Sequence, residues 1–109
     1  MKWYKIFNNL SEAKTKVPLG KTQLLIARDQ RICLAHTHQG FFAIDDACPH
    51  MGESLTKGTT NYLNEIVCPW HNHRFSLTTG TECKDRTAPG RLHKIELRED
   101  GLYLGVQEH

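Results

Sequence analysis

The stretch CPHMGESLTKGTTNYLNEIVCPWH, residues 48–71, contains two short boxes in which a cysteine and a histidine lie close together. Cys48 lies two positions before His50, Cys68 lies three positions before His71, and seventeen residues separate the boxes. Because the proline after each cysteine fixes φ and removes an amide donor, each box is expected to lie in a constrained loop. Thiolates and imidazoles are soft or borderline ligands, so the stretch predicts a metal site built from two loops.

The rest of the chain predicts an all-β fold of antiparallel strands. Short runs rich in Ile, Leu, Val and aromatic residues are separated by turn residues every eight to twelve positions or so, which is typical of small β-sandwiches and barrels. One short helical turn is expected at residues 9–13. In the last hairpin, alternation predicts that Ile95 and Leu97 face the core. We expect strands at residues 3–7, 21–28, 31–37, 41–45, 65–68, 74–77, 92–98 and 102–106.

The length and charge of the chain restrict its class of function. A single domain over residues 1–109 can bury about two thirds of its unfolded surface around one core. The net charge is +2 with both signs scattered, so nothing requires nucleic acid or an anionic membrane. The N-terminal segment lacks the apolar core of a secretory signal, and no run approaches the roughly twenty apolar residues of a spanning helix. We therefore expect a cytoplasmic protein whose four cysteines serve metal or redox chemistry, whereas in an exported chain they could pair in three ways.

The two boxes resemble those of the Rieske family, whose pattern is CxH, a spacer and then CxxH. The similarity extends through FFAIDDACPHMG, which runs into the first box, through RFSLTTG after the second box, and to the late loop Ala88-Pro89-Gly90. It implies a Rieske-like fold of small antiparallel sheets, a sandwich or barrel. The cluster-binding part of that fold would consist of two loops at about residues 46–76.

The resemblance also implies one [2Fe-2S] cluster, with Cys48 and Cys68 on one iron and His50 and His71 on the other. Two ferric ions, two sulfides, two thiolates and two neutral imidazoles give an uncharged oxidised cluster, whereas a cluster with four thiolates is negatively charged. Adding an electron to the neutral cluster costs less electrostatic work. Rieske centres accordingly have reduction potentials of about −150 to +300 mV.

The boxes differ from those of the quinol-oxidising branch of the family. That branch carries an extra disulfide cysteine in each box, and a serine and a tyrosine near the second box whose hydroxyls bond to cluster sulfurs. Fewer hydrogen bonds to sulfur stabilise the reduced state less, so we expect a potential near the lower limit of about −150 mV. Asn72 stands where many relatives have glycine, and because Asn tolerates positive φ we expect the turn to persist. At the four positions that distinguish the quinol-oxidising branch, this chain has Glu53, Trp70, His73 and Phe75.

The resemblance therefore implies a soluble Rieske-type ferredoxin, which is an electron carrier and not an enzyme. It would take one electron from a ferredoxin reductase and pass it to a terminal oxygenase or another redox protein. It would act as a monomer, without nucleic acid or membrane. Self-contained oxygenation is not expected, because the oxygenases of the family need a further domain with a mononuclear iron site.

Two other interpretations of the boxes remain open. The small subunit of an assimilatory nitrite reductase has the same fold but commonly lacks the four ligands. Two cysteines and two histidines also suit a structural zinc module, although a β core of this size needs no zinc to fold.

The other cysteines, His73 and the two aspartates before the first box are expected to have structural roles and not to bind metal. Cys33 is expected to be a buried, inert thiol within a strand, and Cys83 an unpaired thiol at a strand end, with a disulfide between them as the alternative. His73 is expected to point away from the cluster and either to hydrogen-bond or to contribute to a docking rim. Asp45 and Asp46 are expected to be solvated loop acids that cap the turn before the first box.

Overall fold

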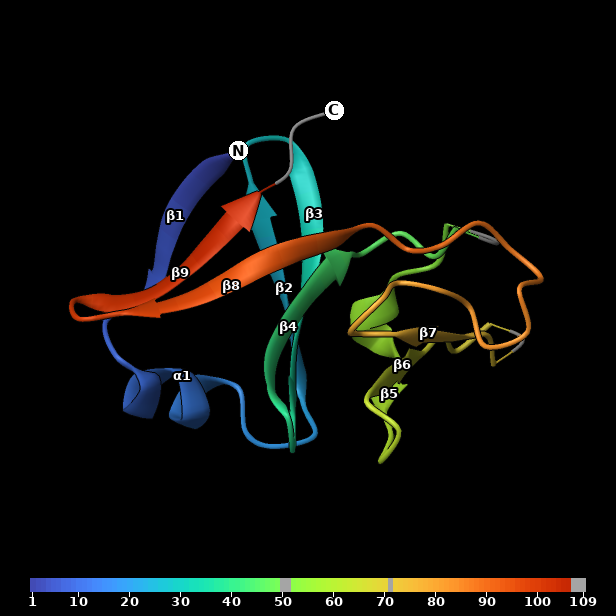
Figure 1. The fold of residues 1–109 in the computed structure, drawn as a ribbon, viewed down its shortest axis with the longest axis horizontal. Helices are drawn as coiled ribbons and strands as arrows, with labels where there is room; N and C mark the ends of the chain where they lie inside the picture. The colour runs from blue at the N-terminus through green and yellow to red at the C-terminus, as the bar shows by residue number, and fades with distance from the viewer. Residues whose placement is uncertain (50–51, 71, 107–109) are drawn as a thin grey trace.

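The structure, a computed structural model, describes residues 1–49, 52–70 and 72–106, which form two antiparallel sheets. The strand order is β1-β9-β8-β4-β3-β2 in the larger sheet and β5-β6-β7 in the smaller one. In Figure 1 the smaller sheet lies to the right of β4 and helix α1 lies to its left. The elements are β1 (Lys2–Phe7), α1 (Leu10–Lys16), β2 (Thr22–Ala27), β3 (Gln30–Thr37), β4 (Gly40–Asp45), the 3-10 turn η1 (Leu55–Lys57), β5 (Thr59–Thr60), β6 (Glu65–Val67), β7 (Arg74–Ser76), β8 (Leu92–Arg98) and β9 (Gly101–Val106).

Strand β3 lies at the centre of the fold, and both of its faces are buried. Ile32 and Leu34 belong to the core clusters of the larger sheet. Cys33 and Ala35 pack instead with buried residues of the smaller sheet, such as Ile66. Because side chains alternate along a strand, one strand supports both cores and fixes the smaller sheet, with its loops, against the larger one.

Helix α1 closes one end of the core of the larger sheet. The Asn9 side chain caps the helix by accepting the Glu12 N–H at 2.7 Å. Ala13 and Val17 are fully buried, and both pack in the core that contains Leu34. The helix is longer than the expected turn because burial of Val17, one turn beyond Ala13, holds a further turn of chain against the sheet.

The predicted all-β fold is confirmed, and each predicted strand begins and ends within one residue of the observed strand. Strand β5 was not predicted, because two threonines show no alternation. The prediction that Leu97 faces the core was wrong, since Leu97 is 55% exposed. Ile95 does pack against the core clusters of the larger sheet, and Leu97 lies two residues further along β8, next to the turn of the β8–β9 hairpin (Figure 1). No helix in the described part of the chain is long and apolar enough to cross a membrane.

Candidate metal centre

The first box begins in a loop whose two ends pair with each other in antiparallel fashion. Ala47 pairs with Ser54 in an isolated bridge. One residue further into the loop, the Cys48 N–H donates to the Glu53 carbonyl at 2.8 Å. Main-chain pairing between described residues therefore closes the base of this loop.

The second box begins in a loop between β6 and β7 whose base is closed in the same way. Val67 pairs with Arg74 at the end of these strands, and the Cys68 N–H donates to the His73 carbonyl at 2.7 Å. In both loops the amide of the cysteine bonds to the carbonyl five residues later. The two cysteines therefore occupy equivalent positions at the bases of their loops.

The turn in each loop depends on a residue with positive φ. Gly52 has φ of 74° and Asn72 has φ of 55°, and each is the fourth residue after its cysteine. Asn is among the few residues other than glycine that adopt this conformation readily. The prediction that Asn72 preserves the turn is confirmed.

The thiols of Cys48 and Cys68 lie together in the core. The two residues are 2% and 0% exposed, neither is in a disulfide, and a hydrogen bond joins their side chains. Burial raises the pKa of the Cys68 thiol to about 11, although the Trp70 N–H donates to its sulfur and opposes the shift. A pair of buried, free thiols suits a soft metal, which binds thiolate and releases the proton. These residues therefore fit an iron–sulfur or zinc centre.

The predicted histidine ligands, His50 and His71, lie outside the described residues, as does Met51. Their part in the metal site stays a prediction. Trp70, beside the second histidine in sequence, is 49% exposed. His73 is only 6% exposed, which suits a packing position and not a docking rim.

Asp46 holds the base of the first loop from inside the protein. Its side chain is 3% exposed, and Oδ1 accepts the Thr56 N–H at 2.9 Å and the Thr56 hydroxyl at 2.5 Å. The Asp46 carbonyl also accepts the Leu55 N–H at 2.7 Å. Asp46 therefore caps a turn, but it is the 3-10 turn η1 that follows the first box, and the expectation that Asp46 is solvated was wrong. Asp45 is half-buried and bonds to the His93 ring at 2.6 Å.

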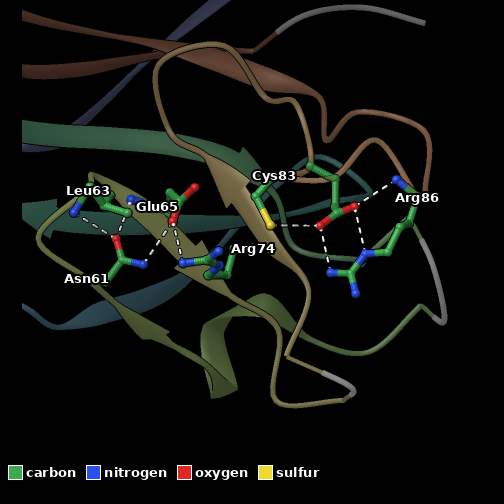
Figure 2. Close-up of polar contacts among 7 residues, drawn as sticks. Asn61, Leu63, Glu65, Arg74, Cys83 and Arg86 are labelled. Carbon is green, nitrogen blue, oxygen red and sulfur yellow. Dashed lines mark hydrogen bonds and ion pairs between the residues drawn. The ribbon is translucent and has the colours of Figure 1, made fainter.

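Polar contacts of β6 and β7 flank the second loop (Figure 2). The Arg74 guanidinium lies 3.7 Å from Glu65 Oε1, which also accepts the Asn61 side-chain N–H at 3.0 Å. Asn61 in turn accepts the Leu63 N–H at 3.0 Å. The first residue after the second loop is thus tied to the turn before β6.

The two other cysteines are free, so the alternative of a disulfide between them does not hold. Cys33 is fully buried, and burial raises its pKa to about 12, as expected for an inert thiol. Cys83 is exposed, and its thiol donates to the Glu82 carboxylate at 3.2 Å. The Glu82 side chain itself is fully buried and ion-paired with Arg86. This pair was not predicted, and its spacing of four residues is the only sequence signal for it.

The sequence is similar to Rieske domains and to ferredoxins of dioxygenase systems. The Rieske [2Fe-2S] domain matches residues 2–96. The chain is 32% identical over 78 residues to the 3-phenylpropionate/cinnamic acid dioxygenase ferredoxin subunit of Photorhabdus laumondii, a match that covers 71% of this chain and 74% of that protein. It is 30% identical over 69 residues to ferredoxin CarAc of Metapseudomonas resinovorans, a match that covers 62% of this chain and 64% of that protein.

The fold is similar to solved structures of two kinds. One is the ferredoxin of carbazole 1,9a-dioxygenase from Nocardioides aromaticivorans, with a TM-score of 0.82, 17% identity and coverage of 98% of this chain and 100% of that one. The other is a protein described as an NADH-dependent nitrite reductase small subunit from Mycobacterium tuberculosis, with a TM-score of 0.82, 13% identity and coverage of 99% and 97%. At these identities the likeness concerns the fold alone, and the fold does not distinguish the two functions.

Proposed function

The chain belongs to the Rieske [2Fe-2S] family, and we propose that it is the ferredoxin of an oxygenase system. In this role it takes one electron from a reductase and passes it to a terminal oxygenase or another redox protein, without transforming a substrate. The observation on which the proposal rests most is the pair of free, buried thiols at equivalent positions of two loops. Its relatives named as dioxygenase ferredoxins support the choice of partner.

We propose Cys48 and Cys68 as ligands of one iron of a [2Fe-2S] cluster, and His50 and His71 as ligands of the other. When bound, the cluster supplies a one-electron redox centre with a potential in the range of about −150 to +300 mV. The chain holds the two thiols on the core side of the loops. The absence of the extra cysteines and hydroxyls of the quinol-oxidising branch supports a potential near the lower limit.

The surface around the two boxes suits a partner that approaches the loops. Pro49, Pro69 and Asn72 are exposed, and Trp70 exposes about half of its surface. The described residues of the two boxes therefore present apolar and uncharged groups to solvent while Cys48 and Cys68 are buried. We also propose that residues 1–109 act as a single domain, with its cluster-binding part at about residues 46–76, and that the protein is a cytoplasmic monomer.

Two alternatives differ from this proposal in measurable ways. A structural zinc module would use the same cysteines and histidines, but it would be colourless and would carry no electron. A nitrite reductase small subunit would support nitrite reduction by a large subunit. The presence of both cysteines in metal-competent positions argues against the nitrite reductase alternative, since such subunits commonly lack the ligands.

The decisive experiment is spectroscopy of protein reconstituted with iron and sulfide, before and after dithionite. We expect a [2Fe-2S] visible spectrum and, on reduction, an EPR signal whose average g lies below that of clusters with four cysteine ligands. Colourless protein that binds one zinc per chain would overturn the proposal. In His71→Cys, an added thiolate makes the cluster more negative and is expected to lower the potential; an unchanged potential would exclude His71 as a ligand.

A further inference from the structure

The Glu82 carboxylate is a buried charge outside the two boxes. Its side chain is fully buried, whereas Arg86 is 41% exposed. Arg86 donates to it from its amide at 2.8 Å, from Nε at 3.1 Å and from Nη2 at 2.8 Å, and the Cys83 thiol donates at 3.2 Å. Figure 2 shows Cys83 and Arg86 on either side of this carboxylate.

This ion pair differs from the others in the described residues. The most comparable carboxylate, Asp46, is 3% exposed, but its nearest cationic atom, on Arg31, lies 4.0 Å away. The Arg86 hydrogen bonds hold the pKa of Glu82 far below its ordinary range. A carboxylate with four donors stays ionised at working pH and orders the residues that supply the donors.

The stretch of residues 82–86, which we call the Glu82 segment, lies beside β7 and extends the smaller sheet. Phe75 and Glu82 form an antiparallel bridge, and the Cys83 N–H donates to the Arg74 carbonyl at 2.8 Å. The Arg74 side chain contacts the Cys83 thiol as well. Arg74 is the first residue after the second loop, so the Glu82 segment fixes the point at which that loop returns to the sheet.

We propose that Glu82 and Arg86 are positioning residues for the cluster: their buried ion pair holds the Glu82 segment on Arg74 and thereby fixes the second loop around Cys68. The inference rests on the proposed ferredoxin function. The link runs through main-chain hydrogen bonds from Cys83 to Arg74 and from Cys68 to the neighbouring His73. The pair acts through these residues and does not contact the metal.

The test uses holoprotein and two variants, Glu82→Gln and Arg86→Lys, with Glu96→Gln as the matched control. Glu96 pairs with Arg98 at 3.0 Å, but this pair lies on the surface of β8, with side chains 49% and 37% exposed. Hydrogen–deuterium exchange is measured by mass spectrometry for peptides covering residues 65–76 and 80–90. The potential and the EPR g values of the reduced cluster are measured on the same samples.

In Glu82→Gln we expect exchange to become about tenfold faster in both peptides, with altered g values and a more positive potential, because a buried negative charge is removed and Arg86 loses its counter-charge. Arg86→Lys keeps the positive charge but loses the two parallel guanidinium hydrogen bonds to Glu82. We therefore expect a smaller increase in exchange in both peptides and little change in potential. Glu96→Gln is expected to behave as wild type.

Faster exchange confined to residues 80–90, with wild-type g values and potential, would overturn the inference, because the pair would then hold only its own segment. If Glu82→Gln does not fold, Arg86→Lys gives the same decision through exchange of residues 65–76. A wild-type protein that forms no [2Fe-2S] cluster would overturn the proposed function instead. In that case the exchange data would still report whether the pair holds the second loop.

Discussion

The two loops that carry the boxes share the main-chain hydrogen bond of their cysteines but are held by different means. The first loop follows β4 and is closed by an isolated bridge, and its base depends on the buried Asp46 carboxylate. The second loop joins β6 and β7, and its base is a regular strand pair that the Glu82 segment extends. The position of each cysteine is therefore set by the same main-chain bond, while side chains hold one loop and a sheet holds the other.

The largest effect is expected when either thiol is removed, which tests whether the loops are equivalent. Cys48→Ser and Cys68→Ser each replace a thiolate by a hydroxyl that stays protonated, so both variants should lose the cluster. Iron content and visible absorption after reconstitution measure this. Cys83→Ser, which keeps a hydrogen-bond donor, should retain both. A Cys48→Ser protein with a full [2Fe-2S] spectrum would show that only the second loop supplies a thiolate.

A smaller effect is expected when the support of the first loop is removed. Asp46→Ala leaves the Thr56 N–H and hydroxyl without their acceptor, so the free energy of unfolding should fall by about 1–3 kcal/mol. Urea unfolding measures it, with Asp29→Ala on the exposed β2–β3 turn as the control. If Asp46→Ala is as stable as the control, the isolated bridge alone holds the first loop.

The smallest effects concern the two residues with positive φ. Gly52→Ala should destabilise the protein by about 1–2 kcal/mol, because a Cβ is unfavourable in this conformation, although it would meet no atom within 4 Å. Asn72→Gly should change the free energy of unfolding by less than about 1 kcal/mol, since relief at the turn is offset by the greater entropy of unfolded glycine. Thermal unfolding compares the two. If the two variants lost the same free energy of unfolding, this prediction would fail. The two loops would then differ in more than the contacts that support them.

That Cys48 and Cys68 come together could be predicted from the sequence because metal ligands require particular residue types at fixed spacings, while the roles of His50 and His71 stay a prediction. Strands such as β8 could be predicted because alternation and turn residues are local properties. The burial of Asp46 could not, since the Thr56 donors that make it favourable lie ten residues further along the chain. The Glu82–Arg86 pair has only its local spacing as a signal, and its burial depends on contact with β7, which no local pattern reveals.

Because β3 contributes Cys33 and Ala35 to the core of the smaller sheet, the proposed cluster-binding part, residues 46–76, is not expected to fold without β3. A peptide excised at residues 46–76 would leave Leu55, Ile66 and Phe75 without the strand that covers them. An engineer who wishes to place this redox centre in another protein must therefore transfer the whole domain. Strand β3 precedes both boxes in the sequence, and the smaller sheet packs against it. A chain that is to hold two iron atoms in these loops must therefore include β3.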